Sequence, residues 1–193
     1  TPLYSSAASD VYKRQFYNSH PKKSTVTAEF CAYKNNDAND KMNALTDTLE
    51  EFGPSEYTKV RENNLIKFVY MSPTQNDWDG MHFVFDLSPY AIKSLTSITF
   101  TWTGGIIEPQ NCDCMELWYY TDSGWAEFDN LDTAVWFTGE NLTKSATWTS
   151  NFEDYIDENC KVHISAVLHV KDEVLAFAYL VTQFVELEIS FER

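Results

Sequence analysis

Glycine and long apolar runs are both scarce in this sequence. Only 6 of the 193 residues are glycine, which excludes collagen-like and other glycine-repeat architectures. The longest apolar run covers residues 174–181 and has the length of a strand, whereas a membrane-spanning helix needs roughly 20 apolar residues. The sequence therefore predicts no membrane insertion. No cleavable signal peptide is visible, and the chain does not begin with Met.

Positive charge is also in short supply. The chain has 14 Lys and Arg against 29 Asp and Glu, a net charge of −15. A surface this negative repels phosphate backbones and anionic lipids, so the sequence predicts no nucleic-acid partner. The charge does not disfavour cations or neutral polar molecules as ligands. The alternative is that the charge serves solubility alone.

Large aromatic side chains are abundant, and apolar residues alternate with polar ones. The chain has six Trp, eleven Tyr and thirteen Phe, enough for a sizeable core. The clearest alternation places Ile98, Phe100 and Trp102 on one face of a strand and threonines on the other. We expect strands at residues 25–33, 57–60, 65–71, 81–87, 97–103, 115–128 (a hairpin), 133–137, 142–149, 162–170, 174–180 and 184–191. The pattern predicts an all-β fold, an antiparallel β-sandwich or jelly roll.

One segment has helical spacing instead. Met42, Leu45, Leu49 and Phe52 recur at near-helical intervals, which indicates one short helix or a structured loop that ends at Gly53-Pro54. This predicts at most one short helix. Asn151 to Asn159 is interpreted as a connecting turn.

Residues 1–15 do not match the rest of the chain. Their sequence, TPLYSSAASDVYKRQ, resembles translated sequencing-adapter read-through of the kind found at the ends of environmental gene fragments. The alternative is a natural disordered tail. In both cases the segment is left out of the fold, and we expect a single domain over residues 16–193.

The stretch MELWYYTDSGWAEF, residues 115–128, predicts two aromatic strands joined by a polar turn. Trp118 and Tyr120 lie on the strand face opposite to Met115 and Leu117, and Trp125 follows the turn. Exposed aromatic rings stack on the apolar faces of sugars. We therefore predict a ligand site that uses Trp118, Tyr120, Trp125, Asp122 and Glu127. The alternative is that both sheet faces are covered and these rings belong to the core.

Two acidic loops offer hard oxygen ligands. They contain Asp37, Asn39 and Asp40 in the first loop and Asp77 and Asp79 in the second. Calcium binds six to eight such oxygens, and neither loop has EF-hand spacing. The sequence predicts no organic cofactor and leaves a structural calcium open, with solvated turn residues as the alternative.

Four cysteines, Cys31, Cys112, Cys114 and Cys160, allow three pairings. A bridge between Cys112 and Cys114 would strain a short ring. The favoured pattern pairs each of them with Cys31 or Cys160, and four reduced thiols are the alternative.

The four histidines are interpreted as structural or exposed. His163 and His169 share a strand face at a separation of about 20 Å, and His20 and His82 have no clear partner in the sequence.

Signatures of catalysis are lacking. The chain contains no Gly-x-Ser-x-Gly, no phosphate-binding glycine loop and no His-Glu-x-x-His. A glycan-cleaving enzyme would need two carboxylates about 5–10 Å apart in one groove, a distance that sequence cannot supply. We expect a protein without catalytic activity and keep such an enzyme as an alternative.

Several motifs together resemble a family of galactose-binding-like (discoidin-like) β-sandwich modules in archaeal and bacterial extracellular proteins. They are HFVFDL at residues 82–87, ITFTWTG at 98–104, LWYY at 117–120, GW at 124–125, NFEDYID at 151–157, KVHI at 161–164 and FVELEI at 184–189. The resemblance covers roughly residues 44–191. Gln183 departs from it, because family members often have Asp just before the last strand. The resemblance implies a jelly roll and appended binding or adhesion without catalysis.

The sequence and the resemblance together predict a secreted or cell-surface module that binds carbohydrate or another surface partner. A structural subunit of a surface layer, filament or viral particle is the rival of a different class. Its apolar edge strands, for example residues 174–180, would pair with a neighbouring copy.

Overall fold

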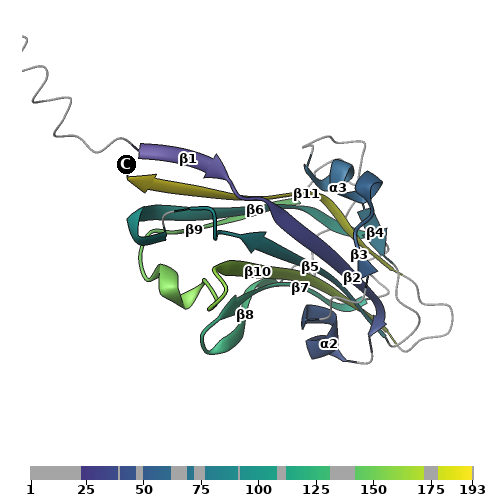
Figure 1. Cartoon of the computed structure of the whole chain (residues 1–193). Helices are drawn as coiled ribbons and strands as arrows, with labels where there is room; N and C mark the ends of the chain where they lie inside the picture. The colour runs from purple at the N-terminus through teal and green to yellow at the C-terminus, as the bar shows by residue number, and fades with distance from the viewer. Residues whose placement is uncertain are drawn as a thin grey trace, which may run out of the picture.

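The computed structural model describes residues 23–38, 40–46, 50–61, 69–71, 77–90, 92–107, 112–130, 142–171 and 178–192. Two sheets face each other across one core, and every strand pair in them is antiparallel. The predicted antiparallel β-sandwich is confirmed (Figure 1). Within these residues, no helix has the length and apolarity to cross a bilayer.

The first sheet contains five strands, two of which are long and central. Its order is β1 (Lys23–Thr27), β11 (Tyr179–Glu192), β6 (Leu95–Ile107) and β9 (Leu142–Trp148), and β4 (Val69–Met71) also pairs with β11. The register sets Lys23 of β1 opposite Glu192 of β11. The first and last described strands therefore lie side by side (Figure 1).

The second sheet has six strands. Its order is β3 (Glu50–Glu51), β2 (Phe30–Ala38), β5 (Trp78–Asp86), β10 (Lys161–Val170), β7 (Cys112–Thr121) and β8 (Gly124–Asn130). The hairpin of β7 and β8 is the predicted aromatic one, with Tyr120 opposite Trp125.

The core lies between the two sheets and follows the sequence alternation. Ile98, Phe100 and Trp102 of β6 are fully buried, and so are Phe83 and Phe85 of β5. In the second sheet, the residues that alternate with these buried ones face outward, among them His82, Trp118 and Tyr120. Alternation therefore separates the residues that stabilise the fold from those that remain available to a ligand.

The described residues include two short α-helices, α2 (Lys41–Thr46) and α3 (Pro54–Arg61), together with 3₁₀ turns at Ile92–Ser94 and Phe152–Asp154. The prediction of at most one helix is corrected here, and so is the strand expected at residues 57–60. Pro54 occupies the first helical position, where its missing N–H costs nothing. Glu56 Oε2 accepts a hydrogen bond of 2.8 Å from the Gly53 N–H, which closes the first turn. Gly53-Pro54 thus begins a helix instead of ending one.

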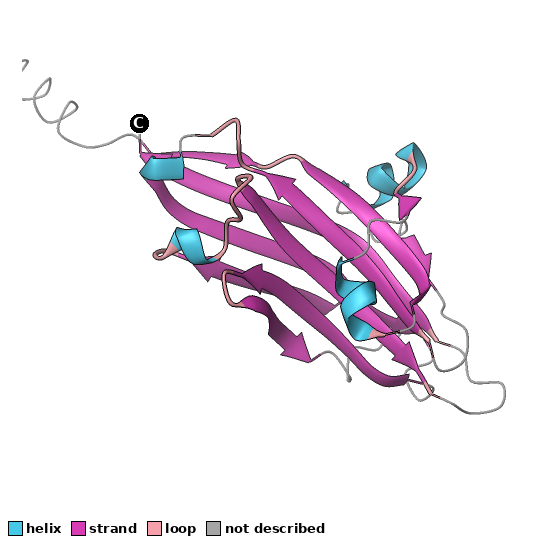
Figure 2. Ribbon diagram, turned by 60° about the horizontal axis from the view of Figure 1, so that its bottom comes forward, coloured by secondary structure: helices cyan, strands magenta, loops and turns pink. Residues whose placement is uncertain are grey.

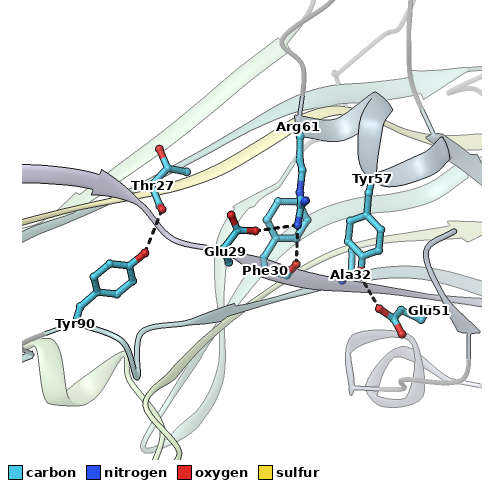
Figure 3. Close-up of polar contacts among 8 residues, drawn as sticks. All are labelled: Thr27, Glu29, Phe30, Ala32, Glu51, Tyr57, Arg61 and Tyr90. Carbon is cyan, nitrogen blue, oxygen red and sulfur yellow. Dashed lines mark hydrogen bonds and ion pairs between the residues drawn. The ribbon is translucent and has the colours of Figure 1, made fainter. Parts of the chain in front are cut away.

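Side-chain hydrogen bonds hold α3 against β2 and β3 (Figure 3). The Tyr57 hydroxyl accepts from the Ala32 N–H at 2.9 Å and donates to Glu51 at 3.0 Å. Burial, reinforced by Glu51, raises the pKa of Tyr57 to about 12, so the hydroxyl keeps its proton. Arg61 donates to Glu29 at 3.1 Å and to the Phe30 carbonyl at 3.3 Å.

Two further strand predictions are corrected. Residues 78–80 belong to β5, although a loop was expected there. Of the expected strand 174–180, residues 179 and 180 belong to the same strand as residues 184–191, β11, which has a bulge between Thr182 and Phe184. Residues 174–177 lie outside the described residues. Gln183 therefore lies inside β11, not before it, and its side chain is fully buried. The strand expected at residues 133–137 and the separate segment 1–15 lie outside the described residues.

The edge strand expected at residues 174–180 is described only at its C-terminal end. There Leu180 is paired on both sides, with Met71 of β4 and Ile106 of β6. This part is central in the sheet and offers no edge for assembly.

Candidate functional site

A hollow opens on the outer face of the six-stranded sheet, with a volume of 480 Å³. Its lining comes from strands β5, β10, β7 and β8, from the end of α2 and from the turn that precedes β10. Figure 1 shows these four strands as neighbours, with α2 beside them, and Figure 2 shows the same helix against the strands from another direction. The fold thus brings together segments that are far apart in the sequence.

Two aromatic rings form one side of the hollow. Tyr120 and Trp125 are register partners on β7 and β8, and their ring centroids lie 5.7 Å apart at 76°. Tyr120 is 36% exposed, and Trp125 is half-buried. Trp125 also meets the ring of His82 edge-on at 5.8 Å. This packing holds the rings in place and leaves part of their surface to a ligand.

A chain of polar side chains, Asp157–His163–His82, runs beside these rings. His163 Nε2 lies 3.1 Å from Asp157 Oδ2, and His163 Nδ1 lies 3.1 Å from His82 Nε2. His82 is 5% exposed. Its burial, together with the neighbouring His163, lowers its pKa to about 3, so its ring is neutral at neutral pH. With Asp157 accepting from His163 and His163 accepting from His82, His82 Nδ1 is an acceptor; it has no hydrogen-bond partner among the described residues.

The turn before β10 holds the carboxylate of this chain. Burial alone would raise the pKa of Asp157, but hydrogen bonds from His163 and from the N–H groups of Lys161 and Asn159 lower it. The two backbone bonds measure 2.8 Å and 2.9 Å. Asp157 therefore stays ionised at neutral pH, and Glu158 and Asn159 beside it also line the hollow.

Helix α2 closes one side of the hollow through Thr46. Ala44 and Leu45 pack on Val167 of β10, and Ser165 Oγ donates a 2.7 Å hydrogen bond to the Leu45 carbonyl. Asp40 caps the helix, because its carboxylate accepts from the Asn43 N–H at 2.9 Å.

A lysine at the start of α2 adds a second anchor. Lys41 Nζ lies 5.1 Å from the ring centroids of both Trp78 and Trp118, a cation–π arrangement. It also donates to Glu116 Oε2 at 2.6 Å. Trp118 donates to the same oxygen at 2.7 Å. These contacts engage Trp118 in holding the helix.

Close approach of α2 to the sheet depends on Gly80. A Cβ at this position would lie 1.7 Å from the Ala44 carbonyl oxygen. We expect Gly80→Ala to displace α2, to reshape the hollow near Thr46 and to lower the free energy of unfolding by about 1–3 kcal/mol, the usual cost of overpacking. Urea denaturation measures this loss. At Gly53 a Cβ would meet only Glu56 Oε2 at 3.7 Å, so Gly53→Ala is the matched control; equal midpoints for the two variants would contradict the assigned contact.

Three of the five predicted ligand residues, Tyr120, Trp125 and Asp122, line the hollow. Trp118 shares their sheet face but packs against the cluster under α2. Glu127, opposite Trp118 in the register, is exposed and outside the lining.

Sequence reasoning missed the histidine pair. His82 was expected to have no partner, yet it bonds His163, and both line the hollow with Asp157. Alternation places both rings on the outward face, which was a usable signal. Their contact requires the register, in which His82 is opposite Ser165 and therefore diagonal to His163.

Of the predicted calcium ligands, Asp40, Asp77 and Asp79 have described side chains. The Asp37 side chain and all of Asn39 lie outside the described residues, and Asp40 caps α2. Asp77 is half-buried, and Asp79 is fully buried within β5. Among the described residues, no group of three or more His, Cys, Asp or Glu is placed to hold a metal ion.

The structure holds Cys31, Cys114 and Cys160 as thiols, and the Cys112 side chain lies outside the described residues. Cys114 is opposite His169 of β10, whereas Cys160 directly precedes that strand. Nine residues of strand separate them, or about 30 Å. The expected bridges are therefore absent among these three, because the sheet places Cys114 and Cys160 at opposite ends of β10.

Comparison with known proteins gives structural matches only. No protein-family model and no curated protein sequence matches the chain. Among solved structures, a xylan-binding module, CBM15, is 7% identical with a TM-score of 0.41, covering 88% of this chain and 97% of that one. A family 32 carbohydrate-binding module from C. perfringens NanJ, solved with galactose, is 13% identical with a TM-score of 0.36, covering 86% and 99%.

A chain described as a glycoside hydrolase also matches, at 13% identity and a TM-score of 0.34, covering 88% of this chain and 33% of that one. At these values the likeness concerns the β-sandwich fold. Function is therefore argued from the side chains of the hollow.

Proposed function

We propose that the protein is a non-catalytic carbohydrate-binding module whose ligand occupies the hollow on the outer face of the six-stranded sheet. One observation carries this proposal: two partly exposed aromatic rings, Tyr120 and Trp125, stand beside a cavity lined otherwise by polar groups. Sugars need this combination, because a pyranose has an apolar C–H face and a rim of hydroxyls.

The polar lining suits hydroxyl recognition. Asp122, Asp157 and Glu158 accept hydrogen bonds, and the Asn159 amide both donates and accepts. The Thr46 hydroxyl donates to the Met42 carbonyl at 2.8 Å and can still accept from a ligand. The 480 Å³ volume falls within the usual range of about 300–1,000 Å³ for small-ligand sites. The hollow therefore fits a short oligosaccharide or the end of a longer chain.

The narrower expectations from the sequence remain part of the proposal. They are a galactose-binding-like module, a role in adhesion and a secreted or cell-surface location. Binding to a glycan outside the cell would be compatible with all three expectations.

The test combines a glycan array with a ring deletion. We expect the protein to bind at least one immobilised glycan, and Trp125→Ala to weaken that binding at least about tenfold, since a central aromatic contact contributes roughly 2 kcal/mol or more. Titration calorimetry measures the affinity, and circular dichroism checks that the variant is folded.

Trp148→Ala is the matched control. Trp148 is another half-buried tryptophan, and it stacks on Tyr155 at 4.7 Å, outside the lining of the hollow. This variant should keep the affinity. Array signals at background for every glycan, or a folded Trp125→Ala variant with full affinity, would contradict the proposal.

A further inference from the structure

The charges around the hollow bear on which sugars it accepts. The charged residues that line it are Asp122, Asp157 and Glu158, and no Lys or Arg is among the described lining residues. Asp122 and Glu158 are exposed, so both carboxylates can meet a ligand at the rim. Asp157 is held ionised by its hydrogen bonds.

Lys34 lies on the sheet face away from the hollow, as the register partner of the buried Met81, and Lys41 lies on α2; both are paired with carboxylates. Lys34 lies 3.0 Å from Glu50 and 2.9 Å from Glu56. Lys41 is bonded to Glu116. These cations therefore do little to offset the negative charge of the hollow.

Lys161, the remaining lysine on β10, lies opposite Asp86. Hydrogen bonds from Ser88 lower the pKa of Asp86, and the charge of Lys161 contributes to this. Asp86 therefore stays ionised opposite Lys161, so its charge partly balances that of Lys161.

His82 adds no positive charge to the hollow and no acceptor that a ligand can reach, because its Nδ1 is buried. His82 is neutral and nearly buried, and its Nδ1 has no hydrogen-bond partner among the described residues. His163 Nε2 lies 3.1 Å from Asp157 Oδ2. The hollow thus offers acceptor groups and negative charge, which suit ligand hydroxyls and ammonium groups.

We propose that the hollow selects sugars by charge, binding neutral sugars and amino sugars and rejecting uronic acids and other carboxylated sugars. This inference rests on the proposed function. A carboxylate on the ligand would face Asp122, Asp157 and Glu158, with no Lys or Arg among the described lining residues to pair with it. An ammonium group would pair with one of these carboxylates.

The experiment titrates four short oligosaccharides of equal length into the full chain at low salt: oligomers of galactose, galacturonic acid, N-acetylglucosamine and glucosamine. We expect glucosamine oligomers to bind at least as tightly as N-acetylglucosamine oligomers. Galacturonic acid oligomers should bind at least about fivefold more weakly than galactose oligomers, the effect of roughly 1 kcal/mol of like-charge repulsion. Added salt should reduce the difference.

Two double variants separate this local effect from the net charge. Asp122→Asn with Glu158→Gln should narrow the gap between galactose and galacturonic acid oligomers. Glu188→Gln with Glu192→Gln makes the same change in net charge on the other sheet, where both residues are exposed, and should leave the gap unchanged.

The outcomes separate this inference from the proposed function. Equal affinity for galactose and galacturonic acid oligomers, or a gap that persists after Asp122→Asn with Glu158→Gln, overturns the charge selection alone. Failure of all four probes, together with an empty glycan array, overturns the proposed function and this inference with it.

Discussion

Replacing Trp102 by alanine is expected to lower the free energy of unfolding by about 3–5 kcal/mol, the usual cost of deleting a large buried aromatic side chain. Trp102 is fully buried between the sheets. Its Nε1 donates a 3.0 Å hydrogen bond to Thr182 Oγ1, and that hydroxyl would lose its donor. Total stability of a domain is about 5–15 kcal/mol, so the variant should lie close to its unfolding threshold.

The surroundings of Trp102 make relaxation difficult. A Cβ on Gly104 would lie 2.2 Å from Cζ2 of the ring, so the backbone of β6 is packed directly against the indole. The site that the ring would vacate lies against β6 and β11, which are paired with each other. It cannot collapse without breaking the hydrogen bonds between these strands, and cavities that stay open cost the most stability.

Urea denaturation followed by circular dichroism measures this effect. We expect a lower midpoint with an unchanged slope. Trp125→Ala is the matched comparison, because it removes the same side chain from the outer sheet face and should cost far less stability. Equal losses in the two variants would show that the assignment of core and surface is wrong.

Acidification from pH 7 to pH 5 is expected to lower the free energy of unfolding by about 2 kcal/mol through His82 alone. Its pKa falls from 6.5 in the unfolded chain to about 3 in the fold. Between these values the unfolded chain binds a proton that the native state does not. Stability from a neutral buried histidine is therefore complete above pH 6.5 and is lost as the pH falls toward 3, by up to about 1.4 kcal/mol per pH unit.

The predicted comparison stops at pH 5, because carboxylates begin to affect stability below that pH. The pKa of Asp157 and of Glu56 is lowered from 3.8 and 4.5, so these groups contribute stability that is lost only as the pH falls through that lower range. Chemical denaturation of the wild type and of His82→Gln at both pH values isolates the histidine. The variant should lack about 2 kcal/mol of the acid loss, while His169→Gln should retain it; the same acid loss in the wild type and His82→Gln would contradict the buried neutral ring.

Much of the fold could be predicted because alternation is a local property. Ile98, Phe100 and Trp102 point inward, and Trp118 and Tyr120 point outward, as their positions in the sequence indicate. Alternation does not specify where strands end or join. For that reason β11 was predicted as two strands, and the role of Gly53-Pro54 as the start of a helix was missed.

The site was predictable only in part, for a related reason. Its aromatic side lies on one hairpin, where Tyr120 and Trp125 are close in the sequence. Its polar side requires β5 and β10 to be neighbours, with His82 diagonal to His163. Register between strands 81 residues apart depends on the packing of the whole sandwich, and no local pattern contains it. The same limit explains Trp118, whose cover comes from α2.

The pairing of β1 with β11 determines how the domain would respond to mechanical load. Lys23 and Glu192 are register partners, so tension applied between these two residues pulls across the strands. The hydrogen bonds between β1 and β11 would then break one after another, instead of bearing the load together in shear. Such a domain yields to pulling at low force, and the hollow lies on the opposite sheet.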